Sequence, residues 1–210
     1  MPQAMPARKA SKMEPMFLPG VENNPKPGSF ADSIHQYQEQ NSEYPQIWHL
    51  FAYQPEATRH LARYTHAVLR GPGPLSVGLR ELIAAYTSAL NQCPFCTNSH
   101  VAIAAEYLGG QPHVWSVVRD LENSTLAEKE KALLRFVAKV NHDAQRIQPS
   151  DMQPLYAVGW DDEAIYHTIT ICAMFNFYNR WIGANGVHAL SEEAHAAGGK
   201  RTAANGYERD

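Results

Sequence analysis

The chain has 210 residues, and its 18 basic and 21 acidic side chains leave a formal net charge of −3 at pH 7. This length fits one domain with a sizeable buried core, and the scattered charge excludes the basic surface typical of nucleic-acid binders. Three cysteines without an apolar N-terminal segment argue against a secreted disulfide scaffold, and the longest apolar run, residues 171–175, is too short to span a bilayer. We therefore expect a cytoplasmic protein with neither nucleic acid nor membrane as partner.

The two ends of the chain differ from its middle. Residues 1–28 are rich in proline and methionine, so we expect an N-terminal arm that is extended, disordered or laid over a neighbouring subunit. From Ser29 on, apolar residues recur at helical spacing and no alternating strand pattern appears. We expect an all-α domain over residues 29–190 and a C-terminal tail over residues 191–210, where Ala, Gly and charged residues give no core pattern.

Capping residues and helix breakers divide the domain. The expected helices cover residues 30–40, 55–69, 77–90, 94–108, 112–121, 126–140, 150–158 and 162–183, with a short segment around 45–51. Ser76 and Asp161 are expected N-caps. The Thr125–Glu128 stretch has the sequence of a capping box, so a helix should open there.

Reactive side chains are concentrated in residues 91–100, which hold two of the three cysteines and a histidine. Pro94 suits the first position of a helix and makes Cys93 the N-cap, so Cys96 lies in the first turn. Unpaired N–H groups there favour an anion, and we expect them to lower the pKa of the Cys96 thiol. Cys93 to Cys96 is i to i+3 and Cys96 to His100 is i to i+4, so all three share one face. Such an arrangement suits a peroxide-reducing or disulfide-exchanging centre.

Glu81 lies on the preceding helix, which only two residues separate from the cysteine helix. Such a short connection predicts an antiparallel helical hairpin. Glu81 is roughly 14 Å back along its helix from the loop, at 1.5 Å per residue, which is the level of His100 to within one turn. An acidic residue near a helix start is usually only a partner for the helix dipole. Here we expect Glu81 to orient His100 as a base for Cys96.

Two other interpretations of the cysteine pair are a structural zinc site and a buried structural pair. Structural zinc usually takes four ligands, but the remaining cysteine, Cys172, lies far downstream in an apolar run without a partner. A redox dithiol is therefore favoured, with no metal and no cofactor. Asn176, Asn179 and Arg180 interrupt the apolar face of the last long helix; satisfying buried backbone ends, or a subunit contact, is favoured over a catalytic role.

The spacing of the four polar residues, Glu-x11-Cys-x2-Cys-x3-His, resembles the alkylhydroperoxidase D core of the carboxymuconolactone decarboxylase superfamily, and most closely its peroxidase-related branch. Residues 75–83 resemble the start of that family's catalytic hairpin. Residues 175–180 and 182–187 resemble its closing helix. The resemblance covers roughly residues 45–190.

The resemblance implies an all-helical, homo-oligomeric protein, a dimer, trimer or hexamer, that reduces hydroperoxides without haem or metal. It implies Cys96 as the peroxide-attacking thiolate, Cys93 as the resolving thiol, and His100 with Glu81 as the proton relay. Electrons would come from an external dithiol, which in the family prototype belongs to a lipoylated protein. The prototype has a histidine immediately before the second cysteine, whereas this chain has Phe95, which removes one hydrogen-bonding group. The superfamily's decarboxylases lack the cysteine pair, which disfavours lactone decarboxylation here.

The sequence thus predicts a thiol-dependent hydroperoxide reductase. One alternative is a disulfide reductase or redox sensor that uses the same two thiols. A second is a non-catalytic helical oligomer that binds a small ligand, with unreactive cysteines.

Overall fold

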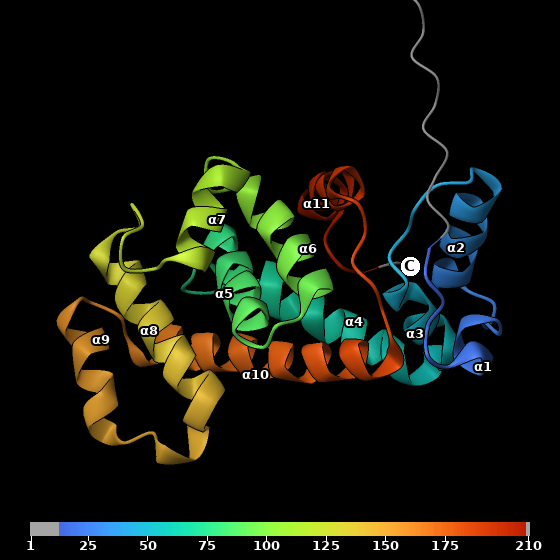
Figure 1. Ribbon diagram of the computed structural model, residues 1–210. Coiled ribbons are helices and arrows are strands. Elements are labelled where there is room, and N and C mark those ends of the chain that lie inside the picture. Colours follow the sequence, from blue (N-terminus) through green and yellow to red (C-terminus); the bar gives the residue numbers. More distant parts are fainter. Residues whose placement is uncertain (1–12, 209–210) are drawn as a thin grey trace, which may run out of the picture.

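The computed structural model describes residues 13–208, and within that range the chain is helical without a strand (Figure 1). The α-helices are α1 Pro19–Glu22, α2 Ser29–Glu39, α3 Ile47–Tyr53, α4 Pro55–Arg70, α5 Val77–Leu90, α6 Pro94–Ala105, α7 Gln111–Arg119, α8 Glu128–Asp143, α9 Gln153–Ala157, α10 Asp162–Asn185 and α11 Glu192–Asn205; the 3-10 helices are η1 Ala144–Arg146 and η2 Pro149–Met152. The predicted all-α fold is confirmed. No helix in the described range is long and apolar enough to cross a membrane.

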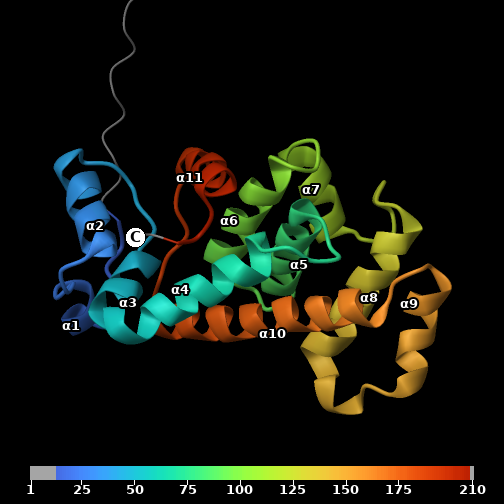
Figure 2. The same ribbon diagram turned by 180° about the vertical axis from the view of Figure 1, so that it is seen from behind.

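Helix α10 runs along one side of the molecule, and α4, α5 and α8 pack against it (Figures 1 and 2). Helices α5 and α6 form the antiparallel hairpin at the centre, with α11 beside α6. Helices α1 to α3 lie at one end of α10, and α8 and α9 lie at the other. The hairpin is thus covered on several sides, which buries most of its side chains.

The two helices that frame the centre begin at the expected caps. Ser76 Oγ accepts a hydrogen bond from the Leu79 N–H at 3.3 Å, and Asp161 accepts one from the Ala164 N–H at 2.9 Å. Each cap satisfies a backbone donor that has no partner within its helix. Helix α10 ends at Gly186, whose φ of 73° is the left-handed conformation that glycine adopts readily.

The predicted capping box at Thr125 is wrong. Helix α8 begins at Glu128, and Ala127 occupies the cap position. The Thr125 hydroxyl instead forms a 3.2 Å hydrogen bond with His113, and the Glu128 carboxylate pairs with Arg135 at 2.5 Å. The Thr125 hydroxyl and the Glu128 carboxylate, the two groups that a capping box would need, are therefore both bound to other side chains.

Part of the expected N-terminal arm is folded. Met16 is buried in the core, and the Phe17 N–H donates to the Asn185 carbonyl at 3.1 Å. Helix α1 packs against α3. The rest of the predicted arm, residues 1–12, lies outside the described residues.

The expectation of a C-terminal tail without core contacts also needs correction. Residues Glu192–Asn205 form α11, which packs along α6. Ser191 caps this helix by accepting a hydrogen bond from the Ala194 N–H at 3.2 Å. Gly199 is buried so closely against α6 that an added Cβ would lie 2.8 Å from the Ala102 backbone carbon. The helix packs through a small residue instead of an apolar stripe, which is why periodicity did not reveal it.

Candidate active site

The hairpin brings Glu81 and His100 into direct contact. Glu81 Oε2 lies 2.6 Å from His100 Nδ1, and the two side chains are 0% and 10% exposed. A carboxylate can only accept, so Nδ1 carries the hydrogen and donates it to Glu81. Nε2 is then the basic ring nitrogen, and no group in the described part of the chain bonds to it. The contact fixes the histidine in the tautomer that a general base requires.

The other oxygen of Glu81 is held by two donors that the sequence did not suggest. Arg70, at the end of α4, donates to Oε1 at 2.5 Å. The hydroxyl of Tyr207, which follows α11, donates to the same oxygen at 2.6 Å. The Arg70 guanidinium lies 4.9 Å from the centre of the Tyr207 ring, as in a cation–π contact. Glu81 is therefore bound by groups from α4, α6 and the C-terminal segment.

These donors explain why a buried carboxyl stays ionised. Burial alone would raise the pKa of Glu81, but the charges and hydrogen bonds of His100, Arg70 and Tyr207 together lower it below the usual value of 4.5. A buried carboxylate without such partners would take up a proton instead. Glu81 is therefore ionised, and the carboxylate orients His100.

The two cysteines lie side by side at the start of α6, and both are free thiols. Cys93 is the N-cap of α6, but its side chain makes no capping hydrogen bond. The neighbouring Cys96 thiol is the main cause that lowers the pKa of Cys93 to about 7; burial opposes this shift, and Asn179 adds a smaller contribution to it. The pKa of Cys96 is raised well above 9.0, first by its hydrogen bond to Cys93 and then by burial.

This corrects the expectation that the helix start lowers the pKa of Cys96. Cys96 is 3% exposed, and its interaction with Cys93 together with burial favours its protonated form. The same interaction favours the thiolate of Cys93. The lowered pKa therefore belongs to the first cysteine of the pair, and the partner thiol is its main cause.

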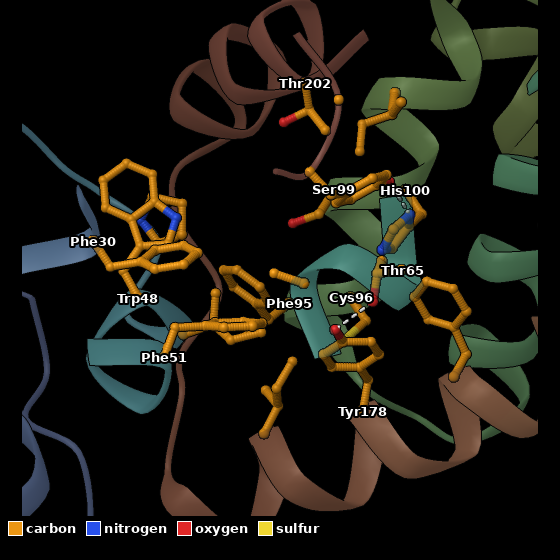
Figure 3. A pocket seen from close by; sticks show the side chains of 18 residues that line it. Phe30, Trp48, Phe51, Thr65, Phe95, Cys96, Ser99, His100, Tyr178 and Thr202 are labelled. Atoms are coloured by element: carbon orange, nitrogen blue, oxygen red, sulfur yellow. Dashed lines mark hydrogen bonds between the residues drawn. The ribbon is translucent and has the colours of Figure 1, made fainter. Parts of the chain in front are cut away.

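A cavity of about 140 Å³ lies beside Cys96 (Figure 3). Cys96 and His100 are among the residues that line it, and Cys93 is not. Much of the rest of the lining is aromatic, from Phe30, Trp48, Phe51, Phe95, Phe175 and Tyr178, and the polar groups include Thr65, Ser99, Thr202 and Tyr207. An engineered apolar cavity of about 150 Å³ binds benzene, so this cavity has room for a small organic molecule against Cys96.

A group of amide side chains holds α10 against the far side of the dithiol. Asn179 is 6% exposed; its amide nitrogen donates to Ser88 Oγ at 3.0 Å, and its amide oxygen accepts from Asn91 at 2.9 Å. Asn176 accepts from Asn91 at 3.3 Å, and Arg180 donates to Asn176 at 2.6 Å. Asn179 also contacts the cysteine sulfurs, so these residues join the hairpin loop to α10 and help to place the thiols.

The third cysteine takes no part in this arrangement. Cys172 is fully buried on α10, and its sulfur lies 3.9 Å from the Val137 carbonyl oxygen on α8. Residues 13–208 contain no group of three or more His, Cys, Asp or Glu side chains that could hold a metal ion.

Comparison with known proteins relates the hairpin to a known family. The profile of the Carboxymuconolactone decarboxylase family matches residues 55–109, which span α4, the hairpin and both cysteines. A solved structure from Ralstonia eutropha JMP134, described as an alkylhydroperoxidase AhpD core and an uncharacterized peroxidase-related protein, is 26% identical, with a TM-score of 0.70 over 80% of this chain and 89% of that one. Residues 55–109 therefore resemble the carboxymuconolactone decarboxylase family, and the chain shares the all-α fold of the alkylhydroperoxidase D-like core.

Two further solved structures share the fold. An uncharacterized peroxidase-related protein from Silicibacter sp. TM1040 is 23% identical, with a TM-score of 0.75 over 87% of this chain and 95% of that one. The debrominase Bmp8, solved in complex with 2,3,4-tribromopyrrole, is 18% identical, with a TM-score of 0.61 over 84% of this chain and 95% of that one. No curated protein sequence matches the chain.

The residue before Cys96 is a phenylalanine, where the prototype of the resemblance has a histidine. The Phe95 ring lines the cavity and lies 5.7 Å from the ring of His195, which α11 supplies. An imidazole is therefore present near position 95, but it comes from a different helix. No sequence pattern linked His195, Arg70 or Tyr207 to the hairpin, because each lies on an element whose contact with the site is set by packing.

Proposed function

We propose that this chain is a thiol-dependent hydroperoxide reductase in which Cys96 is oxidised and Cys93 resolves the product. The observation that carries the proposal is the division of the dithiol: Cys96 lines the cavity together with His100, and Cys93 contacts Cys96 without lining it. A substrate in the cavity would thus contact the Cys96 thiol and His100, while the Cys93 thiol lies next to the reacting Cys96 sulfur.

In the first step the Cys96 sulfur attacks the terminal oxygen of a hydroperoxide ROOH. An S–O bond forms, the O–O bond breaks, and the sulfur loses two electrons to become a sulfenic acid. The thiol proton passes to His100 Nε2 and from there to the leaving RO⁻, which departs as ROH. Glu81 keeps the hydrogen on Nδ1 and stabilises the imidazolium that forms between the two transfers.

In the second step Cys93 gives up its proton and attacks the sulfenic sulfur; the S–S bond forms as the S–O bond breaks, and the hydroxide that leaves takes up that proton and departs as water. A thiol with a pKa of about 7 is substantially ionised at neutral pH and is well suited to this attack. An external dithiol then supplies two electrons and two protons to restore both thiols; a lipoyl group is one dithiol of this kind. Disulfide reduction by the same pair is the alternative activity, and the following experiment separates the two.

The test is the intact mass of the reduced protein before and after one equivalent of cumene hydroperoxide, followed by peptide mapping. We expect a loss of two hydrogens, mapped to a Cys93–Cys96 disulfide. Cys96→Ser should abolish peroxide consumption, and Cys93→Ser should permit one turnover and stop at the sulfenic acid. Cys172→Ser is the matched control and should behave as the wild type, because that thiol is buried outside the cavity.

Full peroxide consumption by both Cys96→Ser and Cys93→Ser would refute the assignment. An unchanged mass after peroxide, together with rapid exchange against a small disulfide, would favour the disulfide reductase. Lack of reaction with either reagent would favour a non-catalytic protein.

A further inference from the structure

A buried histidine of α11 contacts the cavity wall. His195 is 5% exposed and lies beside Phe95 and Ser99 of α6. Its Nδ1 is 3.2 Å from Ser99 Oγ, and its Nε2 accepts a hydrogen bond from the Leu190 backbone N–H at 3.0 Å. Both ring nitrogens are thus engaged, one by a group that can only donate.

The Leu190 bond fixes the tautomer of this histidine. Because the backbone N–H must donate to Nε2, that nitrogen carries no hydrogen, and the hydrogen of the neutral ring is on Nδ1. His195 Nδ1–H therefore donates to Ser99 Oγ. The ring is neutral, because burial lowers the pKa of His195 to about 4. Two charged groups that face the ring have smaller effects: the Glu43 carboxylate raises this pKa, and His100 lowers it.

The direction of this bond decides what the serine can do. Since Ser99 Oγ accepts from His195, its own hydrogen must point elsewhere, and the described residues offer it no other partner. Ser99 lines the cavity, three positions after Cys96 on the same helical face and next to His100. Figure 3 shows the three side chains on α6 at the cavity wall. A hydroxyl that accepts one hydrogen bond also becomes a stronger donor.

We propose that Ser99 is a catalytic residue that donates a hydrogen bond to the substrate oxygen that leaves when Cys96 is oxidised, and that His195 is its positioning residue. This inference rests on the proposed hydroperoxide reduction. As the O–O bond breaks, negative charge develops on the RO oxygen before His100 delivers the proton. The Ser99 hydroxyl stabilises that charge and keeps its own proton, so the balance of the reaction is unchanged.

The test compares two reactions of the same sulfur in the Cys93→Ser background, where Cys96 is the only cysteine that lines the cavity. One is oxidation by cumene hydroperoxide, and the other is alkylation by iodoacetamide, whose leaving group is iodide. We expect Ser99→Ala to slow the oxidation by about 100-fold, as removal of one such donor does elsewhere, and to leave the alkylation rate unchanged. Ser116→Ala, which removes an exposed hydroxyl bonded to the His113 carbonyl, should change neither rate.

The role of His195 has its own comparison. His195→Leu should slow oxidation without slowing alkylation, and His195→Gln should restore most of the rate, because a glutamine amide can both accept from Leu190 and donate to Ser99. Wild-type oxidation in Ser99→Ala, or equal slowing of both reactions, would overturn the inference. Failure of the parent chain to react with any hydroperoxide would instead refute the proposed function.

Discussion

The α5–α6 hairpin and the C-terminal segment, α11 with Tyr207, contribute to the same site in opposite ways. The hairpin supplies Glu81 and His100 from two strongly apolar helices joined by a short loop. The C-terminal segment lacks an apolar stripe, yet it buries His195 and places the Tyr207 hydroxyl on Glu81. The contrast shows that a helix need not have an apolar stripe to complete a site, provided that small residues let it approach closely.

The largest expected effect tests the hairpin. Glu81→Gln leaves Arg70, whose side chain is only 10% exposed, without its counter-ion, so the free energy of unfolding should fall by about 3–5 kcal/mol. Chemical denaturation of the wild type and the variant would measure this change. Glu128→Gln, which breaks an exposed ion pair with Arg135, is the control and should have little effect. Equal losses in the two variants would mean that burial of the Glu81 pair is unimportant.

The next effect tests the C-terminal helix with two adjacent glycines. At Gly199 an added Cβ would lie 2.8 Å from the Ala102 backbone carbon, so Gly199→Ala should push α11 from α6 and destabilise the protein by about 1–3 kcal/mol. At Gly198 the nearest atom is the end of the Arg201 side chain at 3.6 Å, and Gly198→Ala should stabilise the helix by about 0.5–1 kcal/mol. Thermal melting of both variants should show shifts of opposite sign; shifts of the same sign would contradict this packing.

A smaller effect tests the link between the two regions. Tyr207→Phe removes one of three donors to Glu81 and should cost about 1 kcal/mol of stability. The hydrogen bond from Tyr207 lowers the pKa of Glu81 in the folded protein. The stability that this bond contributes is therefore fully present above pH 4.5, the usual pKa of a glutamate, and is lost as the pH falls through the pKa of Glu81 in the folded protein. The difference between variant and wild type should therefore be largest above pH 4.5 and shrink in acid, as denaturation at several pH values would show.

The control for this prediction is Tyr156→Phe, which removes a hydrogen bond of the same 2.6 Å length from the exposed tyrosine to Asp162. We expect no measurable change in stability, because both groups remain solvated. A Tyr207→Phe variant as stable as this control at neutral pH would show that the C-terminal segment does not support Glu81.

The smallest effect concerns thiol reactivity. The alkylation rate of Cys93 in the reduced protein should rise with pH through a midpoint of about 7, and Cys96 should react at higher pH. Asn179→Leu removes one hydrogen bond to the Cys93 sulfur and should move its midpoint upward. Mass spectrometry of mapped peptides would follow each thiol separately. If the alkylation midpoint of Cys96 were lower than that of Cys93, then Cys96, and not Cys93, would be the thiol that loses its proton first.

Local sequence rules predicted most of the hairpin and little of what surrounds it. The contact between Glu81 and His100 follows from a two-residue loop and the helical rise, both of which are local quantities. Arg70 and Tyr207 lie 11 and 126 residues from Glu81, and neither has a spacing that marks it as a partner. The expected acidity of Cys96 was wrong because its interaction with Cys93 and its burial both favour the protonated thiol, and both depend on the folded hairpin.

The sequence by itself determined the all-α class, the caps at Ser76 and Asp161, and the helical face shared by the cysteines and His100, because helix periodicity and capping act within a few residues. The tertiary structure alone decided which groups complete the site. Whether α11 folds onto α6, whether Tyr207 reaches Glu81, and which way Ser99 directs its hydrogen depend on close packing and on hydrogen bonds between distant segments. Such contacts exist only once the helices have assembled.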